Sequence, residues 1–222
     1  IRDRPGMRVA IVGPTGCGKT TFINLLMRFY DVDAGKICID GKPIDELSRH
    51  ALRSCFGMVL QDTWIKQGTV RDNIAYGKLD ATDEEIVRAA KAANCHDFIM
   101  RLPNGYNTDL AEDAANLSQG QRQLLSIARA IAKEPKIYLF DDSFSALDFK
   151  TDSQLRKALK EYTKDATTVI VAQRISTILG ADQIIVLDDG HMAGIGTHKE
   201  LMANCEVYQQ IARSQLSEEE LA

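Results

Sequence analysis

The sequence lacks both a surplus of positive charge and any long hydrophobic run. Its 222 residues include 27 Lys and Arg against 31 Asp and Glu, which gives a net charge of −4 at pH 7. A chain without a basic field offers no general attraction to DNA or RNA phosphates, so we expect no nucleic-acid partner. No apolar stretch approaches the about 18–20 residues of a membrane span, and no cleavable signal is visible at Ile1. We therefore expect this stretch of chain to be soluble.

Cysteine is sparse and scattered. The chain has five cysteines, an odd number, and none forms a Cys-x-x-Cys pair that would hold a metal or act as a redox couple. We expect reduced thiols in a cytosolic protein. The sequence also lacks a linker, a repeat or a low-complexity tract, which indicates a single globular domain. The cysteines are Cys17, Cys38, Cys55, Cys95 and Cys205.

Apolar runs and helical periodicities alternate along the chain, which is typical of an α/β protein. An alternating segment that turns at Asp40-Gly41 predicts an antiparallel hairpin at 36–44. Asp83 and Ser118 are candidate helix starts. Continuous apolar runs predict parallel strands at 8–12, 136–140, 167–172 and 183–187. Helices are predicted at 20–29, 83–95, 121–133 and 152–162.

A phosphate-binding loop follows the first predicted strand. The segment fits the pattern G-x-x-x-x-G-K-[ST], whose backbone N–H groups wrap phosphates. We expect Lys19 to reach the β and γ oxygens and the Thr20 hydroxyl to ligate Mg²⁺. The strand, loop and helix order is the context that this loop requires. The loop residues are Gly13, Pro14, Thr15, Gly16, Cys17, Gly18, Lys19 and Thr20.

An acidic residue ends the apolar strand at 136–140. Asp141 comes directly after Phe140. Because ligands gather at the carboxyl ends of parallel strands, we expect Asp141 to hold the Mg²⁺ that Thr20 ligates.

A second phosphate-binding turn precedes the helix at 121–133. Ser118, Gly120 and Gln121 lie in the stretch Leu117–Gln123, where a Ser-x-Gly-Gln turn opens a helix and offers N–H groups and a hydroxyl to a phosphate. One chain does not easily use two such sites on one nucleotide. We therefore expect two chains that meet face to face with nucleotides between them.

These motifs together resemble the nucleotide-binding domain of an ABC transporter of the exporter type, over nearly the whole chain. Gln61 matches the glutamine of the family's Q-loop, which touches Mg²⁺ or water. Residues Ser145–Asp148 match the D-loop, which crosses to the partner subunit, and 68–74 resembles an exporter-type segment. The motifs occur in the family's order.

The resemblance implies a P-loop NTPase fold with a RecA-like parallel-sheet core, an inserted helical signature subdomain and a truncated antiparallel β-subdomain. It implies one domain over 1–222, with the core at about 1–72 and 135–222 and the helical subdomain at about 73–134. ATP and Mg²⁺ are the implied ligands, with Thr20, Gln61 and Asp141 at the metal. The implied partners are the membrane-spanning domain of the same transporter and a second ABC domain, at the cytoplasmic face of the cell membrane.

Two residues depart from the family's pattern. Asp142 stands where hydrolytic domains have a Glu as general base, and a displacement of about 1 Å in such a group can cost about 100-fold in rate. Gln173 stands where the family has a switch histidine, and glutamine does not titrate near neutrality. With Gln61, these are the candidate catalytic residues. The pair resembles the degenerate half of a heterodimeric exporter, which binds ATP and cleaves it slowly.

Two other functions remain open from the sequence. One is a fully active homodimeric exporter ATPase, and the other is a soluble ABC-type protein without a transport role. In the family an aromatic residue upstream of the loop stacks on adenine, whereas none of the residues before Gly13 is aromatic. We therefore expect the chain to be a fragment of a longer half-transporter.

Overall fold

The computed structural model describes residues 4–111 and 114–217, and these form two compact units. The first unit combines both ends of the chain, residues 1–56 and 168–222, and the second contains residues 57–167. Strands and helices alternate in both units, so the predicted α/β class is confirmed.

The first unit is built on a sheet in which β1 lies between two parallel neighbours, β8 and β9, and β10 pairs with β9 in the antiparallel sense. From Val9 to Val12, β1 is apolar without interruption because both of its faces are covered, and Ala10 and Ile11 are fully buried. The strands are β1 (Arg8–Val12), β8 (Thr167–Val171), β9 (Gln183–Asp188) and β10 (His191–Gly196).

The remaining elements of this unit are helices and one short hairpin. Strands β2 and β3 pair around Asp40 and Gly41, which have φ values of 50° and 78°. Positive φ at both positions is what a type I′ turn requires, so the predicted Asp-Gly hairpin is confirmed. The elements are α1 (Lys19–Leu26), β2 (Cys38–Ile39), β3 (Lys42–Pro43), α2 (Arg49–Ser54), α8 (His198–Asn204), α9 (Glu206–Gln215) and 3₁₀ turns at Ile44–Glu46 and Ile175–Thr177.

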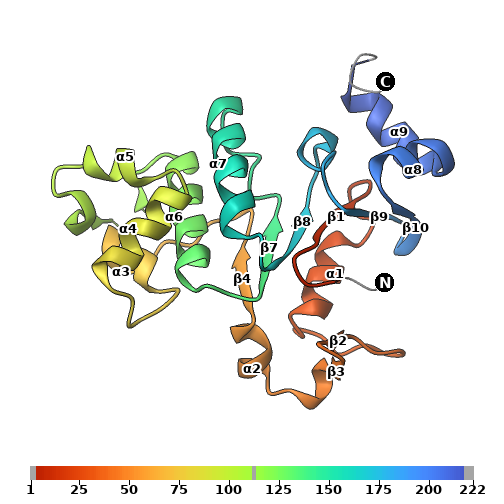
Figure 1. The fold of residues 1–222 in the computed structure, drawn as a ribbon, viewed down its shortest axis with the longest axis horizontal. Coiled ribbons are helices and arrows are strands. Elements are labelled where there is room, and N and C mark those ends of the chain that lie inside the picture. The colour runs from red at the N-terminus through yellow and green to blue at the C-terminus, as the bar shows by residue number, and fades with distance from the viewer. Residues whose placement is uncertain (1–3, 112–113, 218–222) are drawn as a thin grey trace. The chain divides into compact units, whose positions relative to one another are not determined.

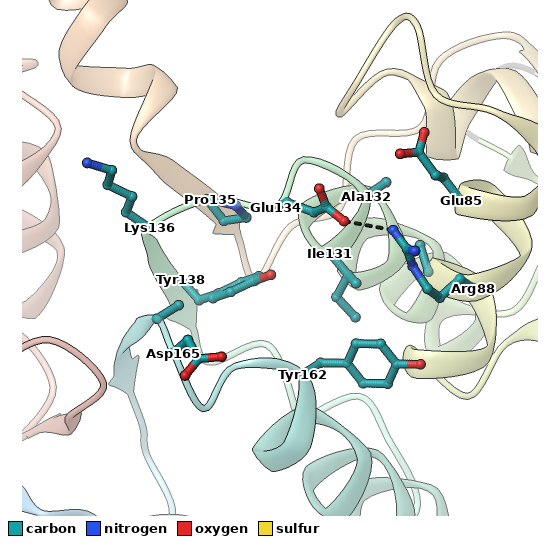
Figure 2. Close-up of a pocket in the computed structure, with 12 residues that line it drawn as sticks. Glu85, Arg88, Ile131, Ala132, Glu134, Pro135, Lys136, Tyr138, Tyr162 and Asp165 are labelled. Carbon is teal, nitrogen blue, oxygen red and sulfur yellow. Dashed lines mark hydrogen bonds and ion pairs between the residues drawn. The ribbon is translucent and has the colours of Figure 1, made fainter.

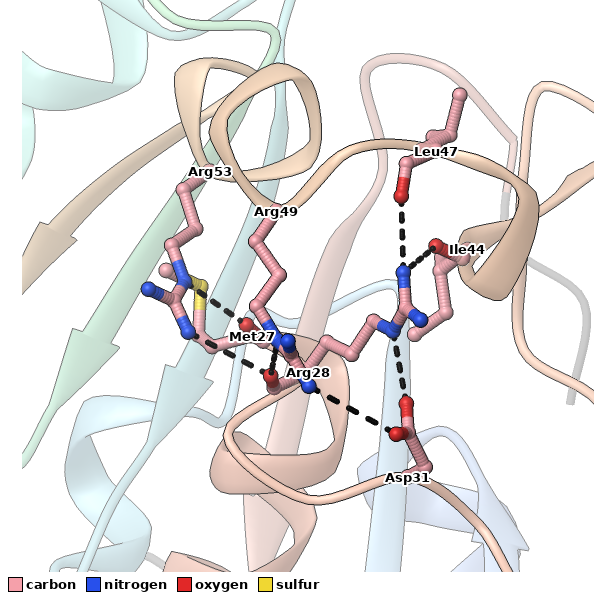
Figure 3. A network of polar contacts seen from close by, with 7 residues as sticks. All are labelled: Met27, Arg28, Asp31, Ile44, Leu47, Arg49 and Arg53. Carbon is pink, nitrogen blue, oxygen red and sulfur yellow. Dashed lines mark hydrogen bonds and ion pairs between the residues drawn. The ribbon is translucent and has the colours of Figure 1, made fainter.

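A network of arginines joins the end of α1 to the hairpin and α2 (Figure 3). Arg28 donates to the carbonyls of Ile44 at 3.2 Å and Leu47 at 2.8 Å, and it pairs with Asp31 at 2.7 Å. Arg53 donates to the carbonyl of Met27 at 3.2 Å. These contacts hold Arg28 at a φ of 52°, a left-handed conformation that costs a non-glycine residue about 1–3 kcal/mol.

The second unit is mostly helical. Helices α3 to α6 gather into one cluster, and α7 lies beside β7 (Figure 1). Strands β7 and β4 are hydrogen-bonded neighbours. The elements are β4 (Phe56–Val59), β5 (Gly68–Thr69), α3 (Val70–Ala75), α4 (Asp83–Ala92), α5 (His96–Met100), a 3₁₀ turn at Gly105–Asn107, β6 (Asp109–Leu110), α6 (Gln119–Ala132), β7 (Ile137–Asp141) and α7 (Phe149–Tyr162).

Three of these helices, α3, α4 and α6, begin at capping boxes, in which a hydroxyl and a second polar side chain satisfy each other's backbone N–H groups. The box that opens α6 joins Ser118 and Gln121, which confirms Ser118 as the helix start. The box that opens α4 joins Thr82 and Glu85, and the helix itself starts at Asp83, as predicted. A threonine hydroxyl caps the N–H of Glu85, while Asp83 lies in the acidic first turn that favours the helix dipole.

The helices in the part of the chain that the structure describes are too short to span a membrane. Helices α6 and α7 each have 14 residues, fewer than the about 20 that cross a bilayer. No helix within 4–111 and 114–217 combines the length and the apolar character of a span.

Candidate nucleotide site

The phosphate loop lies in the first unit, between the carboxyl end of β1 and the start of α1. A Cβ on Gly13 would lie 2.1 Å from the carbonyl oxygen of Leu187 and 2.5 Å from Cys17 Sγ, so only glycine fits there. Cys17 is buried and takes part in the packing of the loop.

The start of α1 is open to an anion. Gly18 stands at its N-cap without a side-chain hydrogen bond, and the first turn has no acidic residue. The first N–H groups of a helix have no intrahelical partner, and the positive end of the dipole lies there. Lys19 Nζ donates to the carbonyls of Gly13 at 2.7 Å and Pro14 at 2.9 Å, which keeps its ammonium on the loop. Thr20 is exposed on the first turn.

The structure brings Gln173 to the same edge of the first unit. β8 runs parallel to β1 with Val171 opposite Ile11, and the N–H of Ala172 donates to the carbonyl of Ile11 at 3.1 Å. Gln173 is the next residue and is exposed. Gln173 and the phosphate loop therefore both follow the carboxyl ends of neighbouring parallel strands.

Gln215 holds the segment after β8, and sequence reasoning missed it. Its Nε2 donates to the carbonyl of Gln173 at 2.8 Å, and its Oε1 accepts from the N–H of Ile175 at 2.8 Å. Gln215 lies at the end of α9, about 40 residues away along the chain. No local motif marks such a residue.

We expect Gln215→Leu to loosen this segment. The substitution removes two hydrogen bonds to the backbone, each worth about 1 kcal/mol. Hydrogen exchange of the Ile175 amide should accelerate about fivefold, measured by NMR or mass spectrometry. Gln210→Leu on the same helix is the control, and equal exchange rates in the two variants would contradict the role of Gln215.

The second unit contains the acidic strand end and the Gln61 segment. Ser143 Oγ donates to the carbonyl of Val59, the last residue of β4, at 2.7 Å. Asp141 ends β7 and Asp142 begins the turn that follows, so this contact joins that turn to the strand that ends two residues before Gln61. The structure therefore brings these three predicted residues to one edge of the second unit.

Asp142 has an unusual backbone conformation. Its φ is 45°, in the left-handed region, where Asp and Asn are the non-glycine residues best tolerated. Its carbonyl accepts from Ser145 Oγ at 2.9 Å. No sequence pattern indicated this conformation, which suits an aspartate better than a glutamate.

The turn within Leu117–Gln123 that opens α6, here called the signature turn, contacts the D-loop in the second unit. Ser118 and Gln119 are exposed at the start of α6, and the Ser118 hydroxyl accepts from the Gln121 N–H at 3.2 Å. A Cβ on Gly120 would lie 3.4 Å from the carbonyl oxygen of Ala146 in the D-loop. Helix geometry leaves the N–H groups of Gln119 and Gly120 free of intrahelical partners, as an anion site needs.

Asp148 closes the D-loop by capping α7. Its carboxylate accepts from the Thr151 N–H at 3.0 Å and from the Thr151 hydroxyl at 2.6 Å. These hydrogen bonds hold the pKa of Asp148 below its usual range.

Comparisons with known proteins agree with these features. The sequence profile described as ABC transporter matches residues 3–145. A fatty acid ABC transporter ATP-binding/permease protein of Mycobacterium bovis is 48% identical over 219 residues, which is 96% of this chain and 35% of that protein. A putative multidrug export ATP-binding/permease protein of Staphylococcus aureus is 48% identical over 206 residues, covering 93% and 36%. The structure of a bacterial Atm1-family ABC exporter with ATP bound matches with a TM-score of 0.92 at 42% identity, covering 96% of this chain and 38% of that one.

This chain belongs to the ABC transporter family. The predicted P-loop α/β fold and the exporter type of ABC domain are confirmed at this level. The chain spans about a third of the length of the curated relatives it matches.

The predicted metal-binding residues carry oxygen donors of the kind that Mg²⁺ takes. Thr20, Gln61 and Asp141 offer a hydroxyl, an amide oxygen and a carboxylate, the hard oxygen donors that Mg²⁺ takes. One protein carboxylate with phosphate oxygens is the usual arrangement for this ion, which does not require an all-protein cage. Within the described residues, no group of three or more His, Cys, Asp and Glu forms such a cage.

A cavity of about 260 Å³ in the second unit does not suit the nucleotide (Figure 2). It lies at the start of β7, near Tyr138, whereas Asp141 ends that strand. Arg88 in its lining is paired with Glu134 at 2.7 Å. Its ionisable lining includes three carboxyl groups against two cationic groups, which disfavours a triphosphate: Glu85, Glu134 and Asp165 against Arg88 and Lys136.

Proposed function

We propose that this chain is the ATP-binding part of an exporter, in which ATP-driven dimerisation of two such domains powers transport. One observation supports this most strongly: the chain has two helix starts suited to phosphate, at α1 and at α6. A domain that binds its own nucleotide and also contacts the nucleotide of a partner needs both. The names of the relatives, which include ATP-binding/permease and export proteins, support the same function.

In this proposal each residue has a defined task. Lys19 leaves its contacts with the loop carbonyls to bind the β and γ oxygens, as a charge-assisted contact. Thr20, Gln61 and Asp141 hold Mg²⁺, which supplies positive charge against the phosphates. Ser118 and the N–H groups of α6 contact the γ-phosphate held by the partner. We keep the division into a core at about 1–72 and 135–222 and a helical subdomain at about 73–134 as part of the proposal.

We further propose that the chain's own site hydrolyses ATP slowly, as in the degenerate half of a heterodimeric exporter. Asp142 is one methylene shorter than a glutamate, so its carboxylate reaches less far toward an attacking water. Gln173 can donate a hydrogen bond to a γ-phosphate but cannot exchange a proton near neutral pH. Both residues preserve binding and weaken cleavage.

The proposed partners follow from the same reading. One is the membrane-spanning domain of the same transporter, and the other is a second ABC domain, in a different chain, that has the glutamate and histidine. This places the domain at the cytoplasmic face of the cell membrane.

Nucleotide binding provides the direct test. We expect Lys19→Ala to weaken Mg-ATP binding about tenfold, because a hydrogen bond from a charged donor is worth about 1.5–3 kcal/mol. Asp142→Ala should leave binding within about twofold, because Asp142 acts on the water rather than on the phosphates. Titration with a fluorescent ATP analogue measures both, and Lys36→Ala, on an exposed lysine, is the control.

The slow site has its own measurement. Single-turnover hydrolysis is followed in the full complex after the partner's site has been inactivated. A rate equal to that of the normal partner site would show that Asp142 and Gln173 do not impair this one, and would favour the homodimeric, fully active exporter.

A further inference from the structure

Helix α6 is hydrogen-bonded to both ends of the segment that contains Gln61. At the entry, Gln123 Nε2 donates to the carbonyl of Leu60 at 3.2 Å. At the exit, Arg129 Nη1 donates to the carbonyl of Trp64 at 3.0 Å. Gln61 thus lies on a short loop whose flanking carbonyls are both attached to the helix that the signature turn opens.

Arg129 also fixes the chain beyond the loop. Its Nε donates to the carbonyl of Asn73 at 2.9 Å, and its Nη2 donates to Asn73 Oδ1 at 3.0 Å. Asn73 Nδ2 donates in turn to the carbonyl of Lys66 at 2.8 Å, and Asn73 Oδ1 accepts from the Lys66 N–H at 2.9 Å. The guanidinium carbon lies 5.7 Å from the ring centre of Trp64 and 5.5 Å from that of Tyr76. A planar guanidinium can donate hydrogen bonds to these acceptors and lie near both aromatic rings at the same time, whereas a lysine ammonium cannot.

Most of these contacts are partly buried, although the one to the Trp64 carbonyl is exposed. Gln123 and Asn73 are each only 1% exposed, and burial lowers the pKa of Arg129. A buried polar group that loses its partner retains the cost of its desolvation, so these hydrogen bonds resist separation. We therefore expect the loop that contains Gln61 and helix α6 to move together.

We propose that Gln123 and Arg129 are positioning residues that make the Gln61 segment and α6 move as one piece. A displacement of Gln61 then shifts the signature turn at Ser118 by the same body movement. This inference rests on the proposed function, in which Gln61 serves the chain's own nucleotide and Ser118 serves the partner's. The two hydrogen-bonded attachments would transmit the state of one site to the other.

The test uses Arg129→Lys and Gln123→Met in the assembled full-length transporter. Arg129→Lys keeps the positive charge but loses the planar guanidinium with its several N–H donors. Gln123→Met keeps the side-chain shape but loses the amide N–H that donates to the Leu60 carbonyl. Each should lower kcat for ATP about tenfold, because a signature turn misplaced by a fraction of 1 Å loses part of its effect. The KM for ATP and the binding of a fluorescent ATP analogue should stay close to the parent values, while the melting temperature should fall moderately because buried backbone and Asn73 acceptors lose a donor. Arg88→Lys, at an exposed arginine of α4, is the matched control.

The double variant, Arg129→Lys with Gln123→Met, distinguishes a positioning role from a general loss of rigidity in the domain. Because both residues hold one loop, the combined change should lower kcat by less than the product of the single effects. Independent, multiplicative effects would overturn the inference, and so would an unchanged kcat in both single variants or a loss of nucleotide binding in both.

Ser118→Arg in the same assay keeps the two proposals distinguishable. If Ser118→Arg abolishes turnover while both positioning variants retain it, the inference alone fails. If Ser118→Arg leaves turnover unchanged, the composite site of the proposed function fails.

Discussion

In the assembled transporter, Gly120→Asp is expected to lower ATP turnover at least about 100-fold, because bringing like charges together costs several kcal/mol. The carboxylate would stand at the start of α6, where the proposed function places the partner's γ-phosphate. Binding at this chain's own P-loop should survive, since that loop belongs to the other unit. Steady-state ATPase and fluorescent-nucleotide titration of the same preparation measure the two effects. Ser118→Arg should have a similar effect through its bulk.

Gly120→Ala is the matched control for this prediction. A Cβ at this position makes ordinary contact with Ala146, 3.4 Å from its carbonyl oxygen, so the D-loop need not move. Alanine also favours the helix by about 1 kcal/mol over glycine. The loss of turnover should therefore be much smaller than for Gly120→Asp. If Gly120→Asp instead abolishes only this chain's own nucleotide binding, the composite-site proposal is wrong.

The second large expected effect is an increase in the rate of ATP hydrolysis. We expect Asp142→Glu combined with Gln173→His to raise hydrolysis at this site about 100-fold, because a longer carboxylate reaches the water and an imidazole can contact the γ-phosphate. Single-turnover assays on the parent, the two single variants and the double variant give the measurement, with the partner's catalytic glutamate removed. A double-mutant cycle shows whether the two residues act as one unit.

The backbone conformation at Asp142 should make the double variant slightly less stable than the parent. With φ at 45°, a glutamate loses the advantage that aspartate has in the left-handed region, so the melting temperature should fall slightly, by an amount equivalent to at most about 1 kcal/mol. The control is Gln173→His alone, which does not touch this strain. Unchanged cleavage in the double variant, with a normal partner signature, would mean that these two residues do not make the site slow.

Local patterns in the sequence were sufficient to predict much of the fold. The long apolar strands and the periodic helices were found to within a few residues, and the Asp-Gly turn was found with its hairpin. The elements that the sequence did not predict are mostly short or lack a clean period. They include β4, β5, β6, β10, α2, α3, α5, α8 and α9. Strands β5 and β6 have only two residues each, too few to show a period. Helices α3 and α8 do begin at local capping boxes, Thr69 with Asp72 and Thr197 with Glu200.

The sequence by itself determined the phosphate loop, the capping serine of α6 and the two departures, Asp142 and Gln173. These are contiguous motifs, and their hydrogen bonds close within a few residues, as in the Ser118 capping box. The order of residues along the chain is therefore sufficient to recognise these motifs.

Only the tertiary structure decided which side chains hold these motifs in place. Gln123 meets Leu60 across 63 positions, Arg129 meets Asn73 across 56, and Gln215 meets the Gln173 carbonyl across 42. Glutamine and arginine on a helix look like ordinary polar positions until packing brings a distant carbonyl within reach. A hydrogen bond between remote residues depends on how the elements pack, and no spacing in the sequence encodes that geometry.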